Sequence, residues 1–281
     1  MNKTLLAASL LLAMGSASAD PFYIDTGFDA SMTDSGQVCA TCTSMKGELL
    51  FTYQSTTTIL ETPASNDDAI GAGDLIFTDG GLVVGPLANN MVTGFTPNEV
   101  FGANSNNGYG SSWLLSFSTT GLAGVVTGVS GTGVPLFTYG PGLLELYITF
   151  DGTTFNNFMD IAITGGGATG VSTVLTGVAD FTSVDPGYNN LIHSGTTSCL
   201  GSDGFYDIWA NCGIAMPITF AASFDTNIFV SDFTWDGADT FTLTSDHDGS
   251  ATFSVPEPGT LALVGLSLLA MGGMARRNKK A

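Results

Sequence analysis

The sequence is poor in basic residues, and those it has lie mostly at its two ends. Of 281 residues only six are Lys or Arg, against 25 Asp or Glu, and five of these bases lie within three residues of the start or six of the end. The 239 residues from Asp20 to Pro258 hold all 25 acids, no arginine and one base, Lys46, which gives this stretch a net charge of −24. Such a body repels phosphate backbones, which argues against nucleic-acid binding.

Residues for nucleophilic or redox chemistry are also scarce. His193 and His247 are the two histidines, and no G-x-S-x-G motif occurs. We expect His247 to be exposed, because it lies within an Asp-His-Asp-Gly stretch typical of a turn. Gly165–Gly170 matches G-x-G-x-x-G, but β-branched residues follow it where a dinucleotide fold needs a helix, so we interpret it as a hairpin loop.

The first 19 residues have the pattern of a secretory signal peptide. Lys3 precedes an apolar stretch from Leu5 to Met14, and an Ala-Ser-Ala cleavage site ends at Ala19. Ten apolar residues in a helix cross only about half of a ~30 Å hydrocarbon core, which argues against an uncleaved anchor. We therefore predict cleavage between Ala19 and Asp20 and export of the remaining chain.

A second apolar segment lies near the C-terminus. Thr260–Ala275 is uncharged, and as a helix it would be about 24 Å long, which suffices for a thin bilayer when flanking arginines snorkel. The positive-inside rule keeps the basic cluster that follows it in the cytoplasm and the body outside. We therefore predict a transmembrane helix over 260–275, followed by a basic stop over 276–280 formed by Arg276, Arg277, Lys279 and Lys280.

A proline-rich joint precedes this segment. In Pro256-Glu257-Pro258 two prolines one residue apart disfavour both a helix and an inner strand, so we expect an extended, protease-accessible chain. The motif, the apolar segment and the basic cluster, in this order, resemble the PEP-CTERM sorting signal of Gram-negative bacteria, here over 255–281. The resemblance implies that the exported chain pauses in the inner membrane and that an exosortase, a membrane thiol protease, processes it at the motif. It also implies release to the cell surface or an exopolysaccharide matrix.

The body has a second resemblance. Val174–Asp185 and Asp248–Val255 are similar to segments of flocculation-associated PEP-CTERM proteins, which help cells aggregate into flocs. This resemblance implies a role in aggregation and defines no residue-level chemistry.

Four cysteines remain in the exported chain. Cys39, Cys42, Cys199 and Cys212 form an even set, which in an oxidising compartment predicts two disulfides with three possible pairings. Proximity in sequence favours Cys39–Cys42 and Cys199–Cys212. The first pair lacks the βαβ setting of a thioredoxin-like site, and the spacing of the second does not suit a four-cysteine zinc site.

The body shows alternating strand patterns and no helical periodicity. Leu144, Leu146, Ile148 and Phe150, for example, fall on one face of a strand. At the C-terminal end we expect a three-stranded meander over 229–235, 240–245 and 250–254, with turns at two Asp-Gly pairs. We predict an all-β fold: a single antiparallel β-sandwich, jelly-roll-like, over 20–254, between an N-terminal signal helix and a C-terminal transmembrane helix. Further strands are expected over 48–58, 75–78, 112–119, 122–130, 143–151, 159–164, 171–181 and 218–224.

Clustered acids are the candidate metal ligands. Divalent cations would relieve the self-repulsion of the body, and carboxylate oxygens suit Ca²⁺. No cluster has the EF-hand spacing, and ordinary turn chemistry is the alternative for each. The weak calcium candidates are Asp232, Asp236, Asp239, Asp246 and Asp248.

Three functions fit this sequence. The first is a non-enzymatic, exported surface or matrix protein that promotes aggregation, flocculation or biofilm formation with exopolysaccharide. The second is a carbohydrate-binding β-sandwich module, for which we expect Trp209 to be the exposed stacking residue and Trp113 and Trp235 to be core. The third is a glycoside hydrolase that uses Glu145, on the polar face of its strand.

The predicted export signal makes a direct prediction about the mature chain. Mass spectrometry of the protein recovered from culture should show Asp20 as the first residue and two intact disulfides. A mature chain that begins at Met1 would contradict the signal-peptide prediction.

Overall fold

The computed structural model describes residues 19–29, 39–63, 69–98, 106–168, 172–213, 217–225 and 228–255. The predicted signal helix, transmembrane helix and basic stop, together with Pro256-Glu257-Pro258, lie outside the described residues. Within the described ranges, none of the helices has the length and apolar character needed to cross a membrane. The described part is mostly β, as predicted, with one α-helix.

The elements are joined by connections of unequal length. In order they are β1 (Phe22–Ile24), β2 (Glu48–Leu60), β3 (Leu75–Gly81), η1 (Leu87–Asn89), β4 (Met91–Thr96), β5 (Leu114–Val129), β6 (Pro135–Tyr139), β7 (Gly142–Thr149), β8 (Asn156–Ala168), β9 (Ser172–Asp180), β10 (Ile192–Ser194), α2 (Phe205–Cys212), β11 (Thr219–Asp225), η2 (Val230–Asp232), β12 (Thr234–Trp235) and β13 (Thr240–Ser254). The longest connections run from β1 to β2 and from β4 to β5.

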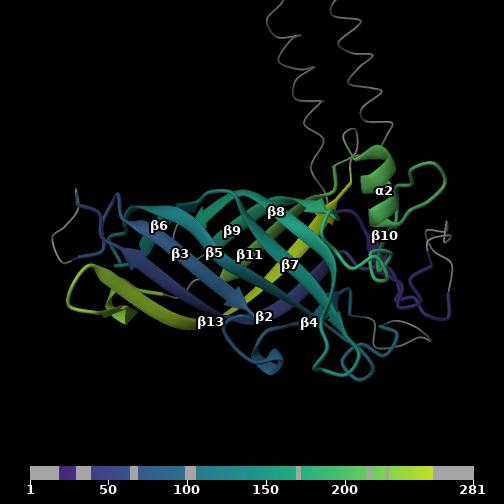
Figure 1. The fold of residues 1–281 in the computed structure, drawn as a ribbon, viewed down its shortest axis with the longest axis horizontal. Helices are drawn as coiled ribbons and strands as arrows, with labels where there is room; N and C mark the ends of the chain where they lie inside the picture. The colour runs from purple at the N-terminus through teal and green to yellow at the C-terminus, as the bar shows by residue number, and fades with distance from the viewer. Residues whose placement is uncertain are drawn as a thin grey trace, which may run out of the picture.

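One antiparallel sheet closes on itself (Figure 1). The closed sheet runs β2-β3-β5-β7-β8-β9-β11-β13, with β6 between β5 and β8 beyond the end of β7. β13 returns to β2 and pairs with it over twelve residue pairs, from Thr240↔Leu60 to Ala251↔Leu49. The predicted sandwich of separate sheets is therefore not what the strands form. Alternation reveals which face of a strand is buried, but the closing pair joins segments almost 200 residues apart, and nothing local in the sequence indicates it.

The interior of the closed sheet has three layers. Along β2, alternate side chains point inward. They are apolar at one end of the strand (Leu49 and Phe51), polar in the middle (Ser55) and apolar again at the other end (Ile59). Apolar clusters therefore fill both ends of the interior. Between them lies a polar layer, which we define as Tyr53, Ser55, Thr57, Thr78, Thr119, Tyr139, Thr173 and His247.

α2 and β10 lie together at one end of the closed sheet (Figure 1). β10 pairs with β1, and α2 buries Phe205 and Ile208. The disulfides are Cys39–Cys42 and Cys199–Cys212, the two pairings that proximity favoured, and the second links the segment after β10 to the last turn of α2. The sequence did not predict α2, because eight residues are too few to show helical periodicity.

The C-terminal meander is wrong in two places. Asp248-Gly249 forms no turn: β13 continues through it, and Gly249 is required because a Cβ there would lie 2.5 Å from the Ser223 carbonyl oxygen and 2.6 Å from the Phe51 ring. Residues 229–235 form a 3₁₀ turn and only two strand residues.

Two predicted core residues are exposed. Phe150 follows the end of β7 and is 47% exposed, and Trp235 is 43% exposed. Trp113, as predicted, is buried. Alternation of apolar and polar residues therefore predicted correctly which side chains point inward within strands. It failed at the strand ends, where the chain leaves the sheet.

The aromatic packing beside α2 leads to a stability prediction. Phe253 is 1% exposed and contacts the rings of Phe22, Phe205 and Phe220 at centroid distances of 5.5, 5.5 and 5.7 Å. Phe253→Ala should lower the free energy of unfolding in urea by about 3–5 kcal/mol, because it leaves a cavity. Leu200→Ala, at a side chain 88% exposed, is the control and should change it by less than about 0.5 kcal/mol. Equal effects would contradict the packing described.

Candidate functional site

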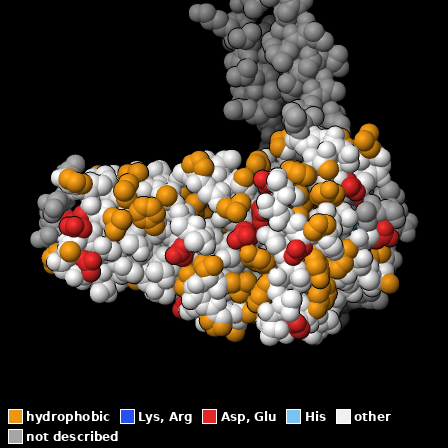
Figure 2. Space-filling view, viewed as in Figure 1, with side chains coloured by type: hydrophobic (Ala, Val, Ile, Leu, Met, Phe, Trp, Pro, Cys, Tyr) orange, Lys and Arg blue, Asp and Glu red, His pale blue; other side chains and the backbone are white. Residues whose placement is uncertain are grey.

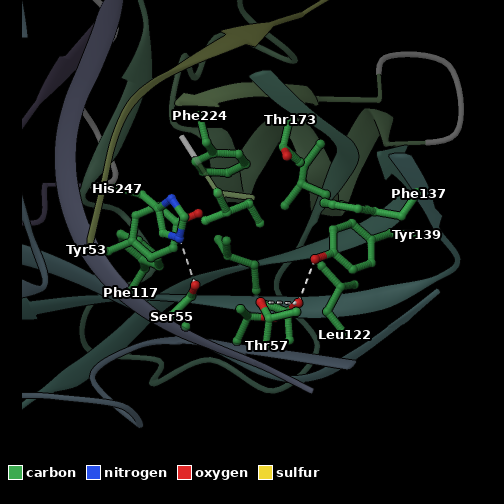
Figure 3. Close-up of a pocket in the computed structure, with 16 residues that line it drawn as sticks. Tyr53, Ser55, Thr57, Phe117, Leu122, Phe137, Tyr139, Thr173, Phe224 and His247 are labelled. Carbon is green, nitrogen blue, oxygen red and sulfur yellow. Dashed lines mark hydrogen bonds between the residues drawn. The ribbon is translucent and has the colours of Figure 1, made fainter. Parts of the chain in front are cut away.

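The polar layer encloses a cavity of about 40 Å³ inside the closed sheet (Figure 3). A buried water needs about 10–15 Å³ measured in this way, so the space suits two or three waters. A sugar ring is too large for it. The side chains around it are strongly ordered by hydrogen bonds, because a buried polar group without a partner destabilises the fold.

His247 organises one side of this layer. Its Nδ1 lies 2.8 Å from the carbonyl oxygen of Asp225, which only accepts, so Nδ1 donates. Nε2 then accepts, and the hydroxyls of Ser55 and Ser245 lie 2.8 and 2.7 Å from it (Figure 3). Burial lowers the pKa of His247, and this favours the same neutral ring. His247 is 7% exposed in the middle of β13, so the prediction of an exposed turn residue is wrong.

Hydroxyl groups form the other side of the layer. The Thr78 hydroxyl lies 3.2 Å from that of Thr57 and 2.6 Å from that of Tyr139. Burial raises the pKa of the Tyr139 hydroxyl to about 12 and that of Tyr53 further, so both stay protonated donors. Thr173 is the exception, since its buried hydroxyl has no partner among the described residues. This orphan hydroxyl points toward the cavity (Figure 3), where an enclosed water would satisfy it.

A larger groove, of about 390 Å³, lies on the outer surface beside this cavity. Phe224 lines both and separates them. The groove forms because β9, β11 and β13 place short polar side chains in register: Ser172 pairs with Asp225, and Ser223 with Ser250. We call this the serine–aspartate groove, lined by Ser172, Ser223, Phe224, Asp225, Asp248, Gly249 and Ser250.

The groove combines two carboxylates with three hydroxyls and has no base in its lining. Such groups accept and donate hydrogen bonds to sugar hydroxyls, and the carboxylates also suit Ca²⁺. The groove is shallow and open, so a sugar residue can reach these groups. The sequence analysis named Asp248 as a candidate but did not name Asp225 or the serines. Alternation along β11 predicts that Ser223 and Asp225 point outward, but the sequence does not show that β11 lies between β9 and β13.

The other calcium candidates are not brought together. An Asp236 carboxylate oxygen accepts from the amides of Ala238 and Thr240, and these bonds lower its pKa; an Asp232 oxygen accepts from the amide of Phe229. These are turn contacts, at the end of the closed sheet where β12 pairs with β13. Asp239 follows the same turn, and Asp246 is exposed on β13. Calcium binding thus stays a prediction, centred on Asp248.

A different set of potential ligands does converge. Among the residues that the structure describes, Asp25, Cys39 and Cys42 form the one group with ligand atoms within 4.8 Å of one another. Both cysteines are in a disulfide, and the Asp25 carboxylate accepts from the Gly27 and Asp29 amides and from the Thr41 hydroxyl. The chemistry of this group is that of a turn and not of a metal site.

The single base of the body does not reach the surface. Lys46 is fully buried; its Nζ donates to Asn106 Oδ1 at 2.8 Å and to the Pro97 carbonyl at 3.2 Å, and lies over the Phe95 ring. Figure 2 shows Asp and Glu side chains spread over one face of the described surface, with no Lys or Arg among them. The described surface is therefore acidic and does not offer a clamp for anionic ligands.

Trp209 and Glu145, the candidates for sugar stacking and hydrolysis, lie elsewhere. Trp209 is half-buried on α2, with Phe181 and Tyr206 at 5.7 and 6.1 Å, so it is not the free platform expected. Glu145 pairs across strands with Ser118 and Asp160. Burial, and then the Glu145 charge, raise the pKa of Asp160. Neither the cavity nor the groove includes Glu145.

His193, unlike His247, lies beside a buried carboxylate. Its Nδ1 is 3.0 Å from an Asp203 carboxylate oxygen, and its Nε2 is 3.1 Å from the Asn190 carbonyl oxygen. The Tyr23 hydroxyl donates to the other Asp203 oxygen at 3.0 Å, and its ring stacks on His193. This buried group ties β1 to β10 and serves the fold.

The His247 network predicts a pH dependence of stability. The pKa of His247 is lowered from 6.5 in the folded protein, so below about pH 6.5 the unfolded chain binds a proton that the folded chain does not. The contribution of His247 is therefore complete above this pH and is lost as the pH falls toward the lowered pKa of the folded protein. Urea unfolding at pH 7.5 and 5.5 should show a smaller drop for His247→Gln than for the wild type. Equal drops would contradict a neutral, buried His247.

Comparison with known proteins gives one match. Residues 254–279 match the family model of the PEP-CTERM protein-sorting motif. No curated protein and no solved structure matches the chain. The match confirms the resemblance inferred from Pro256-Glu257-Pro258 and the segments that follow. The chain therefore carries a PEP-CTERM sorting signal over these residues, which supports an exosortase substrate and implies export across the inner membrane to the cell surface.

Proposed function

We propose that this protein is a non-enzymatic component of the cell surface or extracellular matrix that promotes aggregation, flocculation or biofilm formation by holding exopolysaccharide. The observation that carries the proposal is the sorting motif at 254–279, which addresses the body to the compartment where these polymers accumulate. The body must then act outside the cell, without nucleotide cofactors or a cytoplasmic partner.

The serine–aspartate groove is the polysaccharide site in this proposal. It is open to solvent, it is wide enough for a sugar residue, and it presents hydroxyls and carboxylates from three adjacent strands. The acidic body would repel an acidic polymer, so the groove binds either a neutral glycan or an acidic one through Ca²⁺ held by Asp225 and Asp248.

A non-enzymatic role agrees with the arrangement of the potential catalytic groups. Ser55 and His247 have the spacing of a nucleophile and a base, but they face a cavity for two or three waters and are enclosed by the sheet. Glu145 lies outside the cavity and the groove. We therefore assign the Ser55–His247 contact to the stability of the polar layer.

The groove yields a binding prediction. Asp225→Asn with Asp248→Asn should weaken binding of the host exopolysaccharide about tenfold or more, because hydrogen bonds to charged groups are lost. Co-sedimentation of the purified protein with the polymer, with and without EDTA, measures the effect. Asp246→Asn is the matched control: it removes one exposed carboxylate from β13, outside the groove lining, and should bind like the wild type.

Deletion of the gene tests the biological role. The strain should form smaller aggregates and less biofilm, and the wild-type gene should restore both while the double variant should not. Unchanged aggregation in the deletion strain would refute the proposal. Wild-type binding by the double variant would refute the groove as its site.

A further inference from the structure

The first residue of the predicted mature chain contacts the last described residues before the sorting motif. The Asp20 amide donates to the Phe253 carbonyl at 2.9 Å. An Asp20 carboxylate oxygen accepts from the Val255 amide at 2.6 Å and from the Ser254 hydroxyl at 3.3 Å. We call these three contacts the Asp20 clasp.

The clasp exists because the strand ladder ends at this point. β11 pairs with β13 only as far as Thr219↔Ser254, so Val255 has no strand residue opposite it. Proline follows at 256 and has no amide hydrogen, so the ladder has no donor with which to continue. The Asp20 carboxylate accepts the last available amide. Val255 is consequently 2% exposed and part of the fold.

The match to the sorting motif begins at residue 254, so its first two residues belong to the folded body: Ser254 ends β13, and Val255 follows it and is buried. Four residues, 256–259, separate Val255 from the predicted membrane segment at Thr260. Even a fully extended chain spans no more than about 18 Å over this distance. Because the clasp fixes Val255 to the body, this short connection keeps the α2 end of the body close to the membrane for as long as the chain is anchored.

Proteases bind their substrates as extended chain on both sides of the bond that they process, and strand pairing withholds chain from such binding. We propose that Asp20 is a positioning residue that restrains exosortase processing: its carboxylate keeps Ser254 and Val255 in the folded body, so the protease must wait for this end of β13 to open. Residues at both ends of the mature chain thereby control one maturation step. The inference rests on the sorting motif and is independent of polysaccharide binding.

The test is a pulse–chase in the native host, which follows conversion of the membrane-retained form to the shorter released form. Asp20→Ala should accelerate conversion several-fold, and Asp20→Asn, which keeps one acceptor oxygen, should fall between it and the wild type. Asp185→Ala removes an exposed carboxylate elsewhere and should convert at the wild-type rate. Conversion of Asp20→Ala at the wild-type rate or more slowly would overturn the proposal.

Asp20 also borders the predicted signal cleavage site, so a second variant separates the two roles. The Thr219 hydroxyl donates to the Ser254 carbonyl at 3.1 Å, and Thr219→Val removes this contact by a substitution far in sequence from both processing sites. It should also accelerate conversion, by a smaller factor. N-terminal mass analysis verifies that each variant begins at residue 20.

Hydrogen exchange provides a readout that does not depend on the protease. In the full-length chain in detergent, Asp20→Ala should make the amides of 252–255 exchange about tenfold faster and leave β2 and β5 unchanged. Unchanged protection at 252–255 would overturn the clasp. Replacing both Pro256 and Pro258 by Ala should block conversion, and normal conversion of that variant would refute the sorting assignment itself. If that variant is blocked but Asp20→Ala converts at the wild-type rate, only the clasp is refuted.

Discussion

The pairing of β13 with β2 is the constraint on which the rest of the structure depends. It closes the sheet, because β13 and β2 pair with each other along their length, and it creates a buried interior in which polar side chains need hydrogen-bond partners. Because the register is fixed over twelve residue pairs, His247 is placed beside Tyr53 and Ser55, and Gly249 beside Phe51. The polar layer and the cavity follow from this register, whereas the serine–aspartate groove depends on the pairing of β11 with β9 and β13.

The interior and the exterior of the closed sheet differ in their polar groups. Inside, hydroxyls and one neutral imidazole are enclosed between two apolar clusters, where hydrogen bonds offset the cost of desolvation. Outside, the described surface is acidic, and the one base of the body, Lys46, is buried against Phe95. A surface of this charge makes copies of the protein repel one another at low ionic strength.

The two targeting ends are structurally linked through the body. Asp20 and Val255 are hydrogen-bonded to each other beside α2. The body therefore begins and ends at the same end of the closed sheet. Phe253, packed against Phe22 and Phe205, joins this end to the apolar cluster, and its burial stabilises the start and the end of the body together.

The sequence by itself indicated the destination of this protein, because the sorting motif is a local pattern that other proteins recognise. It also favoured the disulfide pairs that the structure shows and gave the inward face of most strands, since close spacing of cysteines and alternation along a strand are local features as well. Tertiary structure alone decided that the sheet closes, that His247 and Lys46 are buried, that Asp248-Gly249 continues a strand, and that Asp225 joins Asp248 in a groove. These features depend on pairing between strands far apart in the chain, and only the folded sheet brings such strands into register.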